Sequence, residues 1–115
     1  MDFKVLAVGD VVGNPGLDRV RRRLRQLKRD TGADFTVVNG ENAAVVGLLP
    51  HQAEDILDAG ADVITMGNHT WGKREIVDYM EDCPRILRPA NYAPEGPGRG
   101  WQVFGTKAGP VAVID

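Results

Sequence analysis

Short apolar runs alternate along the chain with longer segments that show helical periodicity. The apolar runs cover residues 5–8, 35–38 and 63–66, and the shorter segment 85–87 contains two apolar residues, Ile86 and Leu87. Continuous apolar runs of this length are typical of strands that are buried on both faces of a parallel sheet. Each of the first three runs is followed closely by a glycine and by polar residues. The pattern therefore predicts buried strands with polar carboxyl ends.

Three segments between these runs show the spacing of amphipathic helices. The first begins after Pro15-Gly16 and closes near Thr31-Gly32, where Gly32 is expected to form a left-handed cap. The other two are expected over residues 51–59 and 73–80. In the first segment the apolar residues recur at helical spacing, which predicts one buried stripe. The residues of this stripe are Leu17, Val20, Leu24 and Leu27.

The last part of the chain has a different pattern. A proline- and glycine-rich loop covers residues 89–100, and two short apolar segments at 101–104 and 111–114 follow it, which indicates a β-hairpin. Strands and helices alternate before this hairpin, so we expect an α/β layered sandwich with a mostly parallel sheet and right-handed crossovers. The 115 residues show no linker, repeat or change of composition, so they are expected to form one domain.

Composition and charge mainly exclude certain partners, disulfide bonds and membrane-spanning segments. The 14 basic and 16 acidic side chains nearly cancel, so global charge does not call for a polyanionic partner. The single cysteine, Cys83, cannot form an internal disulfide or a cysteine cluster, and it is expected to act as a small apolar residue. No apolar stretch approaches the ~20 residues of a membrane span, so we expect a cytoplasmic protein without membrane contact.

Ionisable and amide side chains follow each of the first three predicted strands. Because the carboxyl ends of parallel strands share one edge of a sheet, these side chains should meet there. Carboxylate, carboxamide and imidazole groups together suit a divalent first-row metal. Any one of these residues could instead be an ordinary turn former or helix cap, but three successive strand ends favour a site. The candidates are Asp10, Glu41, Asn42, Asn68 and His69.

The same positions carry a family resemblance. The resemblance covers essentially the whole chain and is carried by the blocks GDVVGNPG (residues 9–16), NGENAA (39–44), ITMGNHTW (64–71) and RPANY (88–92). They resemble the calcineurin-like metallophosphoesterases, and they are most similar to the bacterial 2′,3′-cyclic-nucleotide 2′-phosphodiesterase branch of that superfamily. The NGENAA and GNHTW blocks are the most specific of these.

The resemblance implies a catalytic centre with two divalent metal ions, iron or manganese in preference to zinc. Glu41 matches the carboxylate that bridges the two ions. Asp10 and Asn42 would hold one ion, and Asn68 would hold the other. His69 matches the general acid that protonates the leaving ribose oxygen. The implied substrate is a small cyclic nucleotide or a related phosphodiester; the resemblance does not point to substrate-binding residues.

Two features depart from the family pattern. Val12 stands where the wider superfamily has a histidine in its first block. Family members are also much longer and supply further metal-binding histidines from their second half, whereas this chain has only His51 and His69. His51 is expected to be a solvated surface residue. We therefore expect residues 1–115 to be the N-terminal part of a single metallophosphoesterase domain, truncated within its sheet, with an incomplete metal set and weak or absent activity.

A rival hypothesis starts from the first predicted helix. Residues 19–29 contain seven of the 14 basic side chains, and such a face can bind phosphate backbones. A nucleic-acid-binding or non-catalytic module is therefore the alternative function. A solvated helix face is the simpler interpretation, because no aromatic residue is interleaved for base stacking. Trp71 and Trp101 are expected to be packing residues, nucleic acid is not expected as a partner, and self-association stays open.

Overall fold

The computed structural model describes residues 2–115 and has the expected layered α/β fold. A four-stranded parallel sheet has the order β1-β2-β3-β4, and a separate antiparallel hairpin follows it. The strands of the sheet are β1 (Val5–Val8), β2 (Phe35–Asn39), β3 (Val63–Thr65) and β4 (Ile86–Leu87). The helices are α1 (Gly13–Thr31), α2 (Pro50–Asp58) and α3 (Ile76–Asp82). The hairpin consists of β5 (Trp101–Thr106) and β6 (Gly109–Ile114).

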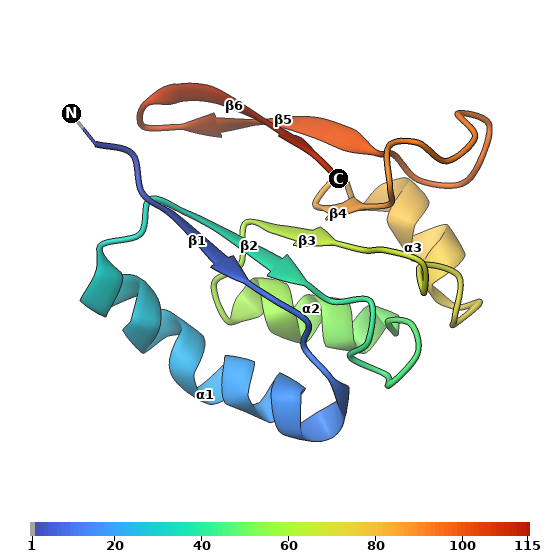
Figure 1. Cartoon of the computed structure of the whole chain (residues 1–115), viewed down its shortest axis with the longest axis horizontal. Helices are drawn as coiled ribbons and strands as arrows, with labels where there is room; N and C mark the ends of the chain where they lie inside the picture. The colour runs from blue at the N-terminus through green and yellow to red at the C-terminus, as the bar shows by residue number, and fades with distance from the viewer. Residues whose placement is uncertain (1) are drawn as a thin grey trace.

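The parallel sheet lies between a helical layer and the hairpin. In Figure 1, α1 and α2 lie against one side of the sheet, and β5 and β6 lie on the other side. The larger apolar cluster joins the sheet to the helices and contains Val20, Leu24 and Ile56. The smaller cluster lies under the hairpin, where the rings of Phe35 and Phe104 meet edge to face with centroids 5.5 Å apart. Burial on both sides explains why the central strands are continuously apolar.

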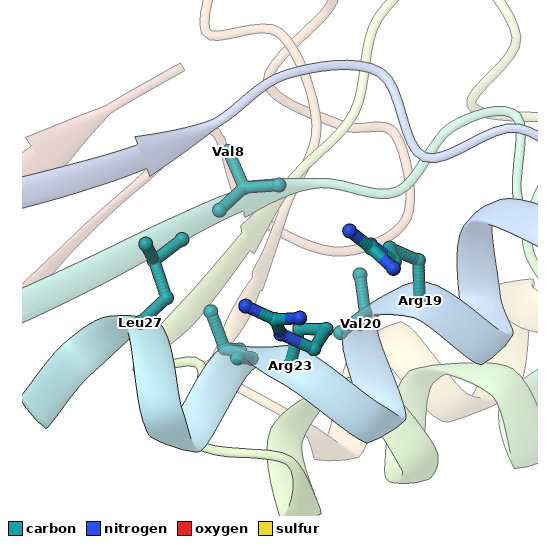
Figure 2. A pocket seen from close by; sticks show the side chains of 6 residues that line it. Val8, Arg19, Val20, Arg23 and Leu27 are labelled. Atoms are coloured by element: carbon teal, nitrogen blue, oxygen red, sulfur yellow. The ribbon is translucent and has the colours of Figure 1, made fainter. Parts of the chain in front are cut away.

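Strand β1 does not have the burial that its sequence predicts. Within residues 2–115 it is an edge strand that pairs with β2 alone, and Val5 is 56% exposed. A hollow of about 220 Å³ lies between β1 and α1. Val8 and Leu27 are among the side chains that line it (Figure 2). Leu27 borders this hollow and is 41% exposed, so the buried stripe of α1 ends at Leu24. The expectation that Leu27 is buried is wrong, because the edge of the sheet does not cover it.

The helix boundaries follow local backbone chemistry. Gly32 ends α1 in the left-handed conformation with φ of 67°, as predicted. The third helix starts at Ile76, later than expected, because the preceding segment forms successive turns. Between β3 and α3 the N–H groups of Thr70, Gly72 and Ile76 donate to the carbonyls three residues before them, at 3.0, 2.9 and 3.3 Å. These turns fix the segment after β3 as a loop.

Two further expectations about single residues have opposite outcomes. Cys83 is half-buried at the end of α3 and packs against the larger apolar cluster, as expected. Trp71 and Trp101 are 41% and 61% exposed, so the expectation that both are packing residues is wrong. Among residues 2–115, no helix combines the length and apolar character that crossing a bilayer needs.

Candidate metal centre at the carboxyl ends of the strands

The carboxyl ends of β1, β2 and β3 lie next to one another at one edge of the sheet. Backbone hydrogen bonds join the loops after β1 and β2 to the last residue of the neighbouring strand. The N–H of Val11 donates to the Asn39 carbonyl at 3.2 Å, and the N–H of Gly40 donates to the Thr65 carbonyl at 3.0 Å. These bonds hold the loops in register beyond the strands, so the structure brings the polar residues that follow them to one place.

Four of the five candidate side chains form a connected cluster. Asn42 Nδ2 donates to Asp10 Oδ1 at 2.7 Å, and Asn42 Oδ1 lies 2.5 Å from His69 Nδ1. The backbone N–H of His69 donates to Glu41 Oε2 at 3.2 Å, while His69 Nδ1 lies 3.7 Å from the same oxygen. Asn68 is exposed, and within residues 2–115 its side chain makes no hydrogen bond. The cluster therefore contains Asp10, Glu41, Asn42 and His69.

The Glu41 carboxylate is held in a fixed place. Its side chain is 14% exposed, and Asn39 Nδ2 donates to its Oε1 at 3.3 Å. A Cβ on Gly67 would lie 2.8 Å from Glu41 Cδ and 2.9 Å from Oε2, distances that real Cβ atoms do not show. Glycine at position 67 therefore leaves the space that the carboxylate occupies.

Asp10 adopts a backbone conformation that is uncommon for residues with a side chain. Its φ is +28°, in the left-handed region that aspartate tolerates better than most residues. Such backbone strain persists only where the surroundings determine it, and it occurs often at functional sites. Here it accompanies the hydrogen bond from Asn42 to the Asp10 carboxylate.

The donor types of the cluster fit a divalent cation, but the number of charged ligands falls short. Carboxylate and carboxamide oxygens are suitable ligands, and Asn39 Oδ1, beside Glu41, is buried without a hydrogen-bond partner. However, Asn42 presents its amide nitrogen to Asp10. Within residues 2–115, no three His, Cys, Asp or Glu side chains come together as a metal site. The described residues thus fit part of a metal-binding set.

Residues that were not predicted to belong to the site form hydrogen bonds with the segment that leads to His69. Asp115 Oδ2 accepts the N–H of Met66 at 2.8 Å, directly before the loop that carries His69. Tyr92 Oη donates to the Gly67 carbonyl at 3.1 Å, and the Thr70 hydroxyl donates to the same carbonyl at 2.5 Å. Only the local Thr70 bond could be anticipated from a turn pattern, because the other two depend on how distant segments dock.

Asp115 makes the stability of the fold depend on pH. Burial raises the pKa of its carboxyl group, the N–H of Met66 opposes this, and the negative charge of Glu41 adds to it. A pKa that is higher in the folded state contributes stability at low pH, and this contribution is lost as the pH rises through the raised pKa. Asp115→Asn keeps an oxygen acceptor for Met66 without the charge.

We therefore expect Asp115→Asn to raise Tm by a few degrees at neutral pH. This advantage should be lost at about pH 3, where the Asp115 carboxyl group of the wild type is largely protonated in both the folded and the unfolded state. Thermal unfolding followed by circular dichroism at both pH values measures the difference. Asp2→Asn, at an exposed position, is the matched control. Equal Tm values for Asp115→Asn and the wild type at neutral pH would contradict the expectation.

Comparison with known proteins decides the family. The family model described as YmdB-like protein matches residues 6–115. The chain belongs to this family. A curated relative of this YmdB-like chain is the 2′,3′-cyclic-nucleotide 2′-phosphodiesterase of Bacillus subtilis (strain 168), which is 46% identical over 98% of the chain. The resemblance found in the sequence is thus confirmed.

Two solved structures share the fold of the YmdB-like chain. A hypothetical protein from Thermus thermophilus matches 96% of the chain with a TM-score of 0.84 and 32% identity. A novel phosphatase from Mycoplasma pneumoniae matches 97% with a TM-score of 0.85 and 31% identity. The chain spans 43% of the Bacillus protein, 43% of the Thermus chain and 42% of the Mycoplasma chain. It is therefore less than half as long as these relatives.

The basic face of α1 is used partly within the domain. Arg21 pairs with Asp55 of α2, and Arg25 donates to the Asp58 carbonyl. Lys28 Nζ donates to the Gly60 carbonyl at 2.6 Å. Arg19 and Arg23 border the hollow in Figure 2. Nucleic-acid binding through this face stays a hypothesis, and the internal contacts give several of these side chains a structural role.

Proposed function

We propose that this chain carries part of the active site of a metal-dependent phosphodiesterase that opens 2′,3′-cyclic nucleotides at the 2′ bond. The observation that carries this proposal is the hydrogen-bonded cluster of Asp10, Asn42, His69 and Glu41 at the carboxyl edge of the sheet. The name and the 46% identity of the Bacillus relative support it, although the chain spans 43% of that relative.

The proposed metal ligands are Asp10, Glu41, Asn42 and Asn68, which would hold two ions, and Glu41 would be the ligand common to both. Iron or manganese is proposed in preference to zinc, as the family resemblance implies. All four proposed ligands are carboxylate or carboxamide groups, whose oxygens suit manganese. When bound, such ions polarise the phosphoryl oxygens and lower the pKa of a water molecule. Asn68 is exposed and makes no hydrogen bond within residues 2–115, so its amide is available for a ligand.

His69 is proposed as the general acid. Its Nδ1 lies 2.5 Å from Asn42 Oδ1, which fixes the ring and leaves Nε2 as the nitrogen for proton transfer. In the reaction, a water oxygen forms a bond to phosphorus and the bond between phosphorus and the 2′ oxygen breaks. His69 donates a proton to the departing 2′ oxygen, and the product is a nucleoside 3′-phosphate. Positioned proton transfer of this kind is an ordinary source of catalysis.

The 115-residue chain itself is proposed to hydrolyse its substrate weakly. Its second histidine, His51, is exposed in the first turn of α2 and is not among the cluster side chains. We propose that the longer relatives complete the metal set with histidines from the remainder of their chains. A chimera that adds the remaining part of the Bacillus relative is therefore expected to be far more active than the isolated chain.

Binding of Mn²⁺ tests the role of Glu41 directly. Glu41→Gln is expected to weaken Mn²⁺ binding by at least about 100-fold, because loss of a ligand should cost no less than loss of a partner that supports one, which costs about 10–100-fold. Glu54→Gln, at an exposed position of α2, is the matched control and should bind Mn²⁺ like the wild type. Electron paramagnetic resonance measures free Mn²⁺ in such a titration. Unchanged affinity in Glu41→Gln would show that Glu41 is not a ligand.

Hydrolysis is tested separately with 2′,3′-cyclic GMP and ³¹P NMR, which distinguishes the cyclic phosphate from the 3′-phosphate. We expect the chimera to require added Mn²⁺ and to lose activity with a chelator. Full activity in the presence of the chelator would overturn the metal mechanism. Turnover by the isolated chain at the rate of the chimera would overturn the claim that its metal set is incomplete.

A further inference from the structure

A hollow of about 330 Å³ adjoins the loop that carries Asn68 and His69. Its lining residues are Trp71, Arg88, Tyr92, Ala93, Gly96 and Pro97. The link to the candidate metal centre is short: Trp71 follows His69 by two positions, and Tyr92 donates to the Gly67 carbonyl at 3.1 Å. The volume lies at the lower end of the range for small-molecule sites. The hollow and the metal centre therefore share the segment from Gly67 to Trp71.

Two aromatic rings line the hollow. The ring centroids of Trp71 and Tyr92 are 6.4 Å apart, with an angle of 34° between the planes. Trp71 is 41% exposed although it is the largest kind of apolar side chain. Exposed aromatic faces next to a phosphodiester site are suited to stack on flat heteroaromatic rings. The chemistry of these walls thus favours a planar aromatic ligand.

Arg88 supplies a polar group to the same hollow. It is only 4% exposed, and its side chain is bonded to backbone carbonyls: Nε donates to Pro97 at 2.9 Å and Nη1 donates to Pro89 at 3.3 Å. Within residues 2–115 it forms no ion pair, and its Nη2 makes no hydrogen bond. Arginine is rarely buried without a charged partner. Donor capacity therefore remains for a ligand that presents acceptors.

We propose that this hollow is the nucleobase subsite and that it prefers guanine. The proposal rests on the proposed function, because it assumes a nucleotide whose phosphate lies at the Asp10–His69 cluster. Trp71 and Tyr92 stack against the base, and Arg88 donates to its acceptors. Guanine presents two adjacent acceptors, O6 and N7, to an arginine, whereas adenine presents an amino donor beside N7. The hollow therefore discriminates between the two purines.

Tryptophan fluorescence tests the subsite without phosphate or metal. The chain has two tryptophans, so Trp101→Ala leaves Trp71 as the reporter. Guanosine is expected to quench Trp71, and adenosine should need at least about fivefold more for half-saturation, the lower value of arginine–guanine discrimination. Because guanosine has no phosphate, this binding can succeed where hydrolysis of the cyclic nucleotide fails. Absence of quenching, equal half-saturation by adenosine, or displacement of guanosine by inorganic phosphate would overturn the proposal.

Variants identify the contacts, with guanosine binding followed by amide NMR shifts. Trp71→Ala should weaken binding by about tenfold or more, whereas Tyr92→Phe, which keeps the ring, should bind guanosine. Arg88→Lys should lose the preference for guanosine. If this variant does not fold, the effect of Trp71→Ala and the comparison of guanosine with adenosine test the proposal instead. Trp101 lines a neighbouring hollow with Arg88 and Tyr92, and Trp101→Ala should bind like the wild type. Loss of binding in Trp101→Ala but not in Trp71→Ala would assign the ligand to that other hollow and overturn the proposal.

Discussion

Replacing His69 with alanine is expected to lower the turnover of 2′,3′-cyclic GMP by about 10²–10⁴-fold, the usual contribution of a positioned general acid. The change removes the ring and its contact with Asn42 Oδ1. It does not remove the bond from position 69 to Glu41 Oε2, because the backbone N–H donates that bond. Mn²⁺ binding should therefore persist while turnover falls. Turnover is measured with the chimera in excess Mn²⁺.

A second substrate separates proton donation from a structural role for His69. A p-nitrophenyl phosphodiester has a leaving group that departs without a proton, so His69→Ala should affect its hydrolysis much less. His51→Ala, at an exposed position in the first turn of α2, is the matched control and should keep normal turnover. An equal loss on both substrates would mean that His69 does not act as the general acid.

Replacing Gly67 with alanine is expected to weaken Mn²⁺ binding by about 10–100-fold with little change in Tm. The new methyl group would occupy the space of the Glu41 carboxylate, whose Cδ would be only 2.8 Å away. The carboxylate is the end of a flexible side chain, so it can move aside at small cost to the fold. It would then leave the backbone N–H of His69 and the amide of Asn39, and loss of such supporting contacts weakens metal sites by this order.

The matched control for this change is Gly105→Ala in the hairpin. Among residues 2–115, apart from Gly105 and its two chain neighbours, no heavy atom lies within 4 Å of the position that a Cβ on Gly105 would take. This variant should bind Mn²⁺ like the wild type. Isothermal titration calorimetry and thermal unfolding of both variants check the expectation. A Gly67→Ala variant with normal Mn²⁺ affinity would show that the position of the Glu41 carboxylate does not matter for binding.

The order of elements was predictable because each strand is short, apolar and followed by a separate helical segment. The place of β1 at the edge of the sheet was not predictable, because strand order depends on contacts between distant segments and not on local periodicity. Its apolar sequence suggested a buried strand, yet Val5 is largely exposed. The exposed tryptophans have the same cause: residue type alone does not tell which surface of a layer remains uncovered.

The candidate site was predictable to the extent that it depends on strand ends. Parallel strands place their carboxyl ends together, and Asp10, Asn42 and His69 meet there. The support from Asp115 and Tyr92 was not predictable, because it requires the hairpin and the loop before it to dock beside β3. Asn68 was predicted as a site residue because it follows the same strand as His69. However, its side chain makes no hydrogen bond within residues 2–115, so it does not join the cluster.

Because Glu41 lies close to Gly67, the residue types that can be tolerated at these two positions depend on each other. A side chain at position 67 and the full length of glutamate at position 41 compete for one space. Aspartate is shorter than glutamate by one methylene group. At position 41 its carboxylate would therefore leave room for the Cβ of an alanine at position 67. The two substitutions are therefore non-additive, and descendants of this sequence can leave glycine at position 67 more readily after position 41 has already become shorter.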